Sequence, residues 1–379
     1  MKLAFITRHR FLDIQTLSKM EYGGGEIYLR DLALLAQSMG FDVTIFQPAQ
    51  VQKITQLDNG IYIQSMPMKW LGLELVDLFT KLKLNDFDHL HFLNFKWVYP
   101  WRFKKATGTA HGIWWDIPSS GGTIKNIARM HVFKNSIKRL IAVATDSTSI
   151  VNLVRSNWPR LASKLHYIPN YVDLQLFNST LYDKNDAKFK YFAAKIPDRL
   201  VVLIPRRLET YRGIWLMFEA AVRAIKTNDN VFFWFVGDGS EKDLLITKVK
   251  ELELEERIHV SGSIQHGLMP EVYAASDIVV IPSLGSEGQP LACLEAFALK
   301  KPVIATLVGD LSDLIIQRFN GILVKPSLEE LEKAILDLAS NDQLRDYLGE
   351  NALRVAKVHD KKLWEERYTT FFESFVQSN

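Results

Sequence analysis

Two glutamates, Glu287 and Glu295, stand out as residues whose type and spacing could do chemistry. Glu287 follows the short apolar run 278–282, which predicts a buried strand, and Glu295 lies in the apolar segment after it, which predicts a helix. Eight helical residues rise about 12 Å, comparable to the separation of a hexose and a ribose joined through a diphosphate. Because each carboxylate oxygen is a strong acceptor, one group could hold sugar hydroxyls while the other holds the ribose diol.

The residues between the two glutamates offer a site for phosphate. Gly288, Gln289 and Leu291 supply backbone N–H groups at the predicted helix N-terminus, where these donors and the helix dipole favour an anion. Pro290 is tolerated in the first turn because its missing N–H would have no partner within the helix. An amphipathic helix with one exposed glutamate is the structural alternative for the same segment.

Two arginines ahead of another predicted helix, Arg207 and Arg212, offer positive charge for a diphosphate. Charge-assisted hydrogen bonds from such groups contribute about 1.5–3 kcal/mol each. Arginines at the end of a strand also form ordinary surface salt bridges, which is the alternative interpretation.

Gly237 belongs to the run VGDGS, which directly follows the apolar segment 231–236. The run resembles the opening of a dinucleotide-binding fingerprint, but Lys242 occupies the third glycine position. We therefore expect a tight strand-to-helix turn here rather than a nicotinamide site.

The elements that must position these residues alternate between short apolar strands and helical patterns along almost the whole chain. Such alternation predicts parallel sheets with right-handed crossovers and helices on both faces. We predict an α/β fold of two Rossmann-like, doubly wound domains, 1–175 and 199–360, facing each other across a cleft. The polar segment 176–198 is the predicted linker, and the helix 361–379 is predicted to pack back on the first domain.

Composition places the chain among globular proteins, with 47% hydrophobic and 23% charged residues in a length of 379. Cys293 is the only cysteine, which excludes an internal disulfide and favours a reducing cytoplasm. No apolar run approaches the roughly 20 residues of a membrane-spanning helix. The first residues turn polar too early for the core of a secretory signal.

The small net charge of +3 conceals an asymmetry. Residues 1–175 hold 21 Lys and Arg against 13 Asp and Glu, and the excess concentrates between Lys96 and Lys164, where only Asp116 and Asp146 are acidic. A solvated face is the ordinary explanation. The alternative is a surface for anionic lipid headgroups or a lipid-linked phosphate, at the inner face of a membrane. No nucleic-acid recognition module is present, so we expect no nucleic-acid partner.

Taken together, these residues resemble the retaining glycosyltransferases of the GT-B fold, specifically glycosyltransferase family 4. The resemblance covers nearly the whole chain and is most specific from 200 to 325. It rests on Arg207, the pair Arg212-Gly213, the run VGDGS, the segment 269–281, the spacing of Glu287 and Glu295, the segment 301–315, Asn320-Gly321, the loop Gly23-Gly24-Gly25-Glu26, His111-Gly112 and the segment 168–173.

The resemblance implies a role for each matching position. Arg207, Arg212, Glu287 and His111 correspond to the catalytic residues. The donor-binding positions are Gly24, Gly25, Gly237, Ser263, Ile264, Gly288, Gln289, Pro290, Leu291 and Glu295, with the base stacking near Ser263 and Ile264.

The loop Trp114-Trp115-Asp116 follows His111 at once. Aromatic faces suit sugar C–H surfaces and a carboxylate suits hydroxyls, so we assign this loop to the acceptor. Packing in a core or an interface explains the tryptophans equally well.

Three positions depart from the family pattern. Arg212 stands where lysine is usual and keeps the charge while favouring planar, bidentate contacts. Gln289-Pro290 replaces a frequent Phe-Gly, which removes a backbone donor, and Tyr171 and Asp310 each replace a common glycine. These changes leave the donor sugar open.

The implied activity is transfer of a hexose from a nucleotide diphosphate sugar, UDP-glucose by preference, to a saccharide or lipid-linked acceptor in polysaccharide or glycolipid biosynthesis. The alternatives are a GDP-mannose-dependent mannosyltransferase and an epimerase of a UDP-sugar on the same architecture. No cofactor is expected. The pair Asp86 and Asp88 has the spacing of a metal site in a different glycosyltransferase fold, but it lacks further ligands, so no metal is expected either.

Overall fold

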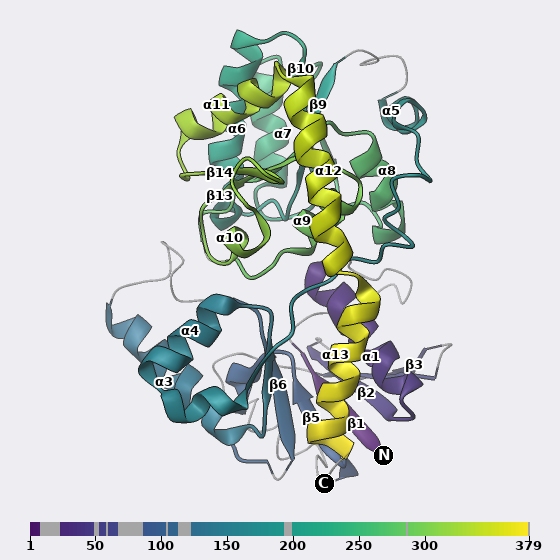
Figure 1. The fold of residues 1–379 in the computed structure, drawn as a ribbon, viewed down its shortest axis with the longest axis vertical. Coiled ribbons are helices and arrows are strands. Elements are labelled where there is room, and N and C mark those ends of the chain that lie inside the picture. Colours follow the sequence, from purple (N-terminus) through teal and green to yellow (C-terminus); the bar gives the residue numbers. More distant parts are fainter. Residues whose placement is uncertain are drawn as a thin grey trace. The chain divides into compact units, whose positions relative to one another are not determined.

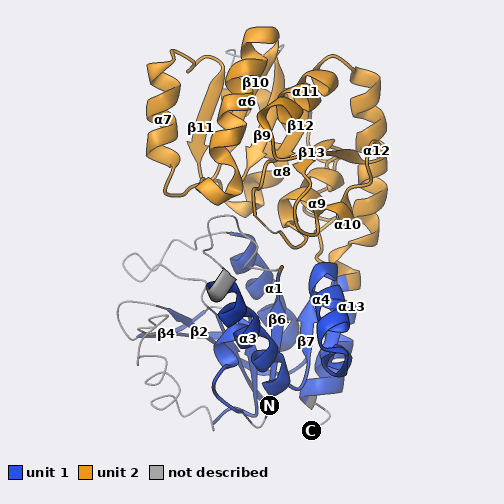
Figure 2. Ribbon diagram, turned by 90° about the vertical axis from the view of Figure 1, so that its left-hand side faces the viewer, with its two compact units in different colours: residues 1–111, 122–168, 364–379 blue, residues 112–121, 169–363 orange. Residues whose placement is uncertain are grey.

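A computed structural model (Figure 1) describes residues 1–7, 23–48, 53–57, 60–66, 86–103, 105–112, 123–192, 199–285 and 287–377. The chain divides into two compact units, which Figure 2 colours separately. Unit 1 comprises residues 1–111, 122–168 and 364–379, and unit 2 comprises residues 112–121 and 169–363.

Unit 1 is built on an eight-stranded sheet in the order β3-β4-β2-β1-β5-β6-β7-β8. Every neighbouring pair is parallel except β3 and β4. The chain moves outward from β1 through β2 and then crosses to β5 on the other side, which is a doubly wound arrangement. The strands are β1 Lys2–Ile6, β2 Asp42–Pro48, β3 Lys53–Gln56, β4 Tyr62–Met66, β5 His89–Phe92, β6 Ala106–Ala110, β7 Val143–Thr145 and β8 Leu165–Tyr167.

Helices supply the apolar cover of this sheet, so its central strands are buried along nearly their whole length. The unit 1 helices are α1 Gly24–Ser38, α3 Thr123–Arg139, α4 Thr148–Asn157 and most of α13 Lys361–Phe372, with the short helical segments η2 Phe95–Val98, η3 Pro159–Lys164 and η7 Glu373–Gln377.

Unit 2 has a six-stranded, all-parallel sheet in the order β11-β10-β9-β12-β13-β14. Side chains alternate across it: Val201 and Leu203 join one core with α9, whereas Val202 and Ile204 join the other with α6. The strands are β9 Leu200–Pro205, β10 Val231–Val236, β11 Ile258–Gly262, β12 Ile278–Ile281, β13 Val303–Thr306 and β14 Gly321–Val324.

The helices of unit 2 pack on both faces of this sheet. They are α5 Lys184–Phe192, α6 Ile214–Thr227, α7 Lys242–Glu251, α8 Met269–Ala274, α9 Leu291–Ala298, α10 Leu311–Leu314, α11 Leu328–Ala339 and α12 Asp342–Val358, with the single turns η5 Thr210–Arg212 and η6 His266–Leu268. Two doubly wound units of this kind confirm the predicted α/β class.

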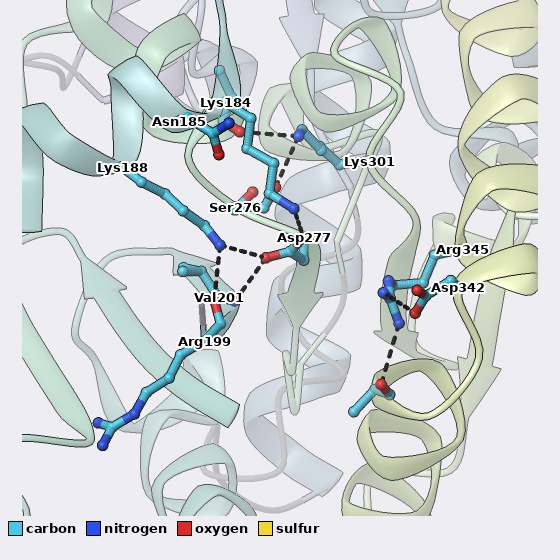
Figure 3. A network of polar contacts seen from close by, with 12 residues as sticks. Lys184, Asn185, Lys188, Arg199, Val201, Ser276, Asp277, Lys301, Asp342 and Arg345 are labelled. Carbon is cyan, nitrogen blue, oxygen red and sulfur yellow. Dashed lines mark hydrogen bonds and ion pairs between the residues drawn. The ribbon is translucent and has the colours of Figure 1, made fainter. Parts of the chain in front are cut away.

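The predicted linker 176–198 is corrected by the structure, because its described part folds into unit 2. Phe177 is buried in that unit's core, and α5 is held by charge: Asp277 forms ion pairs with Lys184 and Lys188 (Figure 3). Lys188 also donates to the Arg199 carbonyl at 2.8 Å. A polar helix fixed by ion pairs has weak apolar periodicity, which explains its resemblance to a linker in the sequence. Residues 193–198 lie outside the described residues.

The chain passes between the two units at residues 111–112, 121–122, 168–169 and 363–364, whereas the sequence predicts boundaries at 175 and 360. Residues 364–379 belong to unit 1, where Trp364, Tyr368 and Phe372 of α13 are fully or almost fully buried. These aromatic side chains make the C-terminal helix an integral part of the unit 1 core.

Candidate functional site

The polar side chains of unit 2 gather where the strand order reverses. β9 has β10 on one side and β12 on the other, and in open parallel sheets ligands bind at the carboxyl ends of the strands beside such a switch point. Arg206 is the first residue after β9, and Ser283 and Glu287 lie in the loop that follows β12.

Close backbone contacts at glycines shape this end of the sheet. A Cβ on Gly237 would lie 1.9 Å from the carbonyl oxygen of Arg206, and one on Gly239 would lie 2.3 Å from that of Leu208. The VGDGS run is therefore a turn packed against the loop after β9, as the sequence predicts, and only glycine fits at these two positions. Its structural role is to fix the loop that carries Arg206.

Gly213 fixes the turn that carries Arg212 in a similar way. Its φ is +73°, and a Cβ there would lie 1.7 Å from the carbonyl oxygen of Pro282. The backbone N–H of Leu284 donates to the Tyr211 carbonyl at 3.1 Å. Since glycine alone permits both this dihedral and this approach, the turn η5 lies directly against the loop after β12.

Glu287 is the centre of the resulting cluster. Its Oε1 accepts hydrogen bonds from two guanidinium groups, Arg206 Nη2 and Arg212 Nη1. It also accepts one from Ser283 Oγ at 2.5 Å, and Arg206 Nη2 donates to the same hydroxyl at 3.0 Å. Glu287 is 7% exposed and Arg206 is 9% exposed, so these charges meet inside the protein.

The electrostatics of the cluster follow from that burial. Burial by itself raises the pKa of the Glu287 carboxyl, but Arg206 and then Arg212 outweigh it and lower that pKa to about 2. For Arg212, burial lowers the pKa, and the pairing with Glu287 outweighs it, so that the pKa rises. Two guanidinium groups thus face one carboxylate, which leaves a net positive charge at the ends of β9 and β12.

Arg207, a predicted catalytic residue, is exposed just after the end of β9. Its neighbour Arg206, which the sequence analysis did not single out, pairs with Glu287. The sequence offers two adjacent arginines and only one usable signal, which is that Arg206 directly follows the buried run 200–205 and so lies nearest the switch point. Arg212 and Glu287 are brought together as predicted.

Glu295 lies on α9 and is also buried, 7% exposed. Its Oε2 accepts a hydrogen bond from the Tyr273 hydroxyl at 2.8 Å, and its Oε1 lies 3.1 Å from His266 Nε2. Burial, followed by the Glu295 charge, raises the pKa of Tyr273 well above its ordinary value. Sequence reasoning missed both partners, because nothing in their spacing links them to a residue more than 20 positions away.

Between the two glutamates, α9 begins at Leu291 with Pro290 as its N-cap and no side-chain capping bond. Gln289 is 2% exposed and is tied to Asn170: its Oε1 accepts from the Asn170 N–H at 3.0 Å, and its carbonyl accepts from Asn170 Nδ2 at 2.6 Å. Gly288 packs against Gly112, where a Cβ would lie 3.1 Å from the Gly288 nitrogen. These contacts hold the loop that leads into the helix N-terminus.

In unit 1, His111 follows β6. Its Nδ1 lies 3.1 Å from Asp146 Oδ2, and the Tyr28 ring meets the imidazole edge-on at a centroid distance of 4.6 Å. Asp146 is 3% exposed. Such a carboxylate fixes the proton on Nδ1 and leaves Nε2 as the acceptor, with this tautomer inferred from the hydrogen bond.

Comparison with known proteins agrees with this architecture. Residues 186–355 match the family described as Glycosyl transferases group 1, and residues 22–176 match Glycosyltransferase Family 4. Sucrose-phosphate synthase from Thermosynechococcus elongatus has a similar fold, with a TM-score of 0.80 and 20% identity over 100% of both chains. The chain belongs to glycosyltransferase family 4, with the GT-B fold.

Two further similar proteins are described by a sugar-nucleotide ligand or by a sugar-transfer reaction. Anabaena HepE, solved in complex with UDP-glucose, has a TM-score of 0.76 and 18% identity over 98% of this glycosyltransferase and 99% of HepE. Alpha-D-kanosaminyltransferase from Streptomyces kanamyceticus is 27% identical over 158 residues, 41% of each chain. The glycosyltransferase spans about half the length of the curated relatives it matches.

The remaining predicted residues of the glycosyltransferase are placed as follows. Gly24 and Gly25 form the first turn of α1 in unit 1. Ser263 and Ile264 directly follow β11 in unit 2, with Ser263 exposed. The predicted acceptor loop, Trp114-Trp115-Asp116, lies outside the described residues.

Unit 1 contains a buried ladder of hydrogen-bonded polar side chains on β5 and β6, which the sequence analysis did not predict. His89 Nε2 and His91 Nδ1 each lie 2.9 Å from Thr107 Oγ1, and His91 Nε2 lies 2.8 Å from Thr109 Oγ1. Burial lowers the pKa of His89 to about 4 and that of His91 to about 3, so both rings are neutral. The ladder continues through Tyr368 to Tyr28, beside His111.

The described residues contain no group of three or more His, Cys, Asp or Glu side chains arranged to hold a metal ion. Asp88 instead accepts the backbone N–H of Lys2 at 2.7 Å. Within the same residues, no helix is long and apolar enough to cross a membrane.

Proposed function

We propose that this glycosyltransferase transfers a hexose from a nucleotide diphosphate sugar, UDP-glucose by preference, to a saccharide or lipid-linked acceptor with retention at the anomeric carbon. The observation that carries the proposal is the buried cluster at the ends of β9 and β12, where Arg206 and Arg212 face the single carboxylate of Glu287. An uncompensated positive charge beside a helix N-terminus favours an anionic ligand such as a diphosphate.

The proposed reaction breaks the bond between the anomeric carbon and the diphosphate and forms one to the acceptor oxygen on the same face. The acceptor proton passes to the departing phosphate oxygen. Negative charge develops on the diphosphate in the transition state, and fixed donors aimed at that charge are the largest source of catalysis in such reactions. Arg207, Arg212 and the N–H groups of α9 are the donors that we assign to it. Glu295 is assigned to the ribose.

The identity of the sugar-nucleotide donor is the more specific part of the proposal. HepE, of similar fold, was solved with UDP-glucose, which supports testing uridine donors first, and GDP-mannose is the rival. The purified protein would be incubated with a panel of sugar nucleotides and acceptors, with released nucleotide and product mass measured. Release from UDP-glucose is the expected result, and release from none of the donors would refute the function. Product from a UDP-sugar without any acceptor would indicate the epimerase instead.

His111 is proposed to contact the donor hexose or the acceptor. Asp146→Asn is expected to lower turnover at least about tenfold, because the neutral amide no longer fixes the proton on His111 Nδ1. Steady-state kinetics of donor consumption measure this. Asp42→Asn, at an exposed position of β2, is the matched control. Equal turnover in both variants would exclude His111 from the reaction.

Contact with a membrane through unit 1 is a separate part of the proposal. The helix α3 has five Lys and Arg residues and no acidic residue, and Ile127 on it is 62% exposed. Some nearby cations have internal roles: Lys164 Nζ donates to the Lys138 carbonyl at 3.0 Å and Arg139 Nε to the Pro100 carbonyl at 3.2 Å. Lys125 and Lys138 are exposed, so they are the charges that we assign to anionic headgroups.

Sedimentation with vesicles tests this assignment. The protein is expected to bind phosphatidylglycerol-containing vesicles in preference to phosphatidylcholine ones. Lys125→Glu/Lys138→Glu should weaken that binding at least about 30-fold, since each lysine near such a surface contributes about 1 kcal/mol. Lys250→Glu/Lys357→Glu, which reverses two exposed charges of unit 2, is the control and should bind like the native protein. Equal binding to both vesicle types would contradict the membrane assignment.

A further inference from the structure

Arg206 is a charged side chain in a position that stability alone does not explain. It is 9% exposed, and its Nε is a buried donor without a hydrogen-bond acceptor among the described residues. Burial lowers the pKa of its guanidinium, although Glu287 acts in the opposite direction. Burying a guanidinium is unfavourable unless its partners compensate, and the only carboxylate paired with it among the described residues is Glu287.

Glu287 does not need Arg206 to be neutralised. Arg212 forms its own ion pair with the carboxylate, and Ser283 adds a hydrogen bond. Without Arg206 the charges of the site would balance one to one. The second guanidinium must therefore contribute something other than charge balance.

The geometry shows what that contribution is. Arg206, Arg212 and Ser283 all donate to the same atom, Oε1 of Glu287. No described residue donates a hydrogen bond to Oε2. Three donors on one oxygen fix the rotation of the carboxylate and leave its second oxygen to a ligand.

We propose that Arg206 is a positioning residue that holds Oε1 of Glu287 against Arg212 and so presents Oε2 to the hydroxyl groups of the donor hexose. The inference rests on the proposed function and deepens it, because it assigns the sugar contact to one oxygen and the orientation of that oxygen to one arginine. A carboxylate held in this way needs no reorganisation when the reacting sugar distorts.

The pH dependence of activity should depend on the same charges around the Glu287 carboxylate. The carboxylate of Glu287 is faced by Arg206 from the end of β9, by Arg212 from η5 and by Ser283 from the loop after β12. Its pKa of about 2 lies below its ordinary 4.5, so the carboxylate is ionised at any pH above that range. Loss of one of the two cations raises this pKa, so the acid limb of the activity profile moves upward.

Arg206→Met is the decisive variant, because Met fills a similar volume and leaves Glu287 paired with Arg212. We expect kcat to fall about 10²-fold with a smaller change in KM, as for a misplaced contact to the reacting sugar. The acid limb should move to higher pH. The Tm should stay within about 4 °C of the native value or rise, since no buried charge is orphaned. Arg206→Lys, which keeps the charge, should recover part of kcat.

Arg223→Met is the matched control, since it removes an exposed arginine of α6 in the same unit, away from the site. It should match the native enzyme in kcat, acid limb and Tm. A native kcat in Arg206→Met would overturn the inference. So would a loss of activity that follows a large fall in Tm while the acid limb stays in place, because that pattern marks a purely structural residue.

The experiment separates the inference from the function on which it rests. Variants are compared only with a donor that the native protein consumes. Absence of turnover by the native protein with every donor refutes the proposed function. Turnover by the native protein that Arg206→Met leaves intact refutes the role of Arg206 alone.

Discussion

Glu287→Gln is expected to lower the free energy of unfolding of unit 2 by about 3–5 kcal/mol, the usual effect of removing one partner of a buried ion pair. The amide cannot balance Arg206 and Arg212, which both point at the same oxygen, so two buried cations are left to repel each other. Turnover should fall at least about 10²-fold, because the donors of the site lose their fixed geometry. Chemical denaturation and nucleotide release measure the two effects.

A second substitution separates stability from catalysis. In Glu287→Gln/Arg206→Met one of the orphaned cations is gone, so most of the lost stability should return while turnover stays low. Glu255→Gln, at an exposed position of unit 2, is the control and should change stability by less than about 0.5 kcal/mol. If the double variant is less stable than Glu287→Gln, the two arginines do not share one charge partner.

The pH dependence of stability gives a further check on the same residue. The pKa of Glu287 is about 2 in the folded protein, below its ordinary 4.5. A lowered carboxyl pKa stabilises the folded state fully above the ordinary value, and this contribution is lost as the pH falls toward the folded value. The stability difference between the native protein and Glu287→Gln should therefore narrow between about pH 4.5 and 2.

The fold was accessible from the sequence because its parallel strands are short, continuous apolar runs separated by helical patterns. Segments such as 231–236 and 278–281 are buried on both faces, so their composition alone identifies them. The helix α5 shows where this signal ends. It is attached by the pairing of Lys184 and Lys188 with Asp277, about 90 residues later, and ion pairs between distant residues leave no periodic trace.

The candidate site was accessible only in part, for a related reason. The spacing of Glu287 and Glu295 identified both glutamates, and Arg212 was identified by the glycine after it. Arg206 was missed because packing at the end of β9 decides which of two successive arginines turns inward, and the only signal in the sequence is that Arg206 directly follows the buried run 200–205. His266 was missed because its contact with Glu295 depends on how η6 packs against α9.

Gly213→Ala is expected to have the other large effect, although it adds only one methyl group. The new Cβ would overlap the Pro282 carbonyl oxygen at 1.7 Å, and the residue would have to keep a φ of +73°. The left-handed dihedral and the overlap together should lower the free energy of unfolding by about 2–5 kcal/mol. Relief of the overlap moves η5 away from the loop after β12, so that Arg212 no longer pairs with Glu287. Turnover should therefore fall about 10²-fold.

Gly40→Ala isolates the part of this effect that comes from the dihedral. Gly40 has a φ of +85°, but its Cβ would meet no atom within 4 Å, so only the left-handed conformation is penalised, by about 1–2 kcal/mol. Turnover should be unchanged. A similar stability loss and a native turnover in Gly213→Ala would mean that η5 tolerates displacement. The contact between Gly213 and Pro282 would then not be what places Arg212 against Glu287.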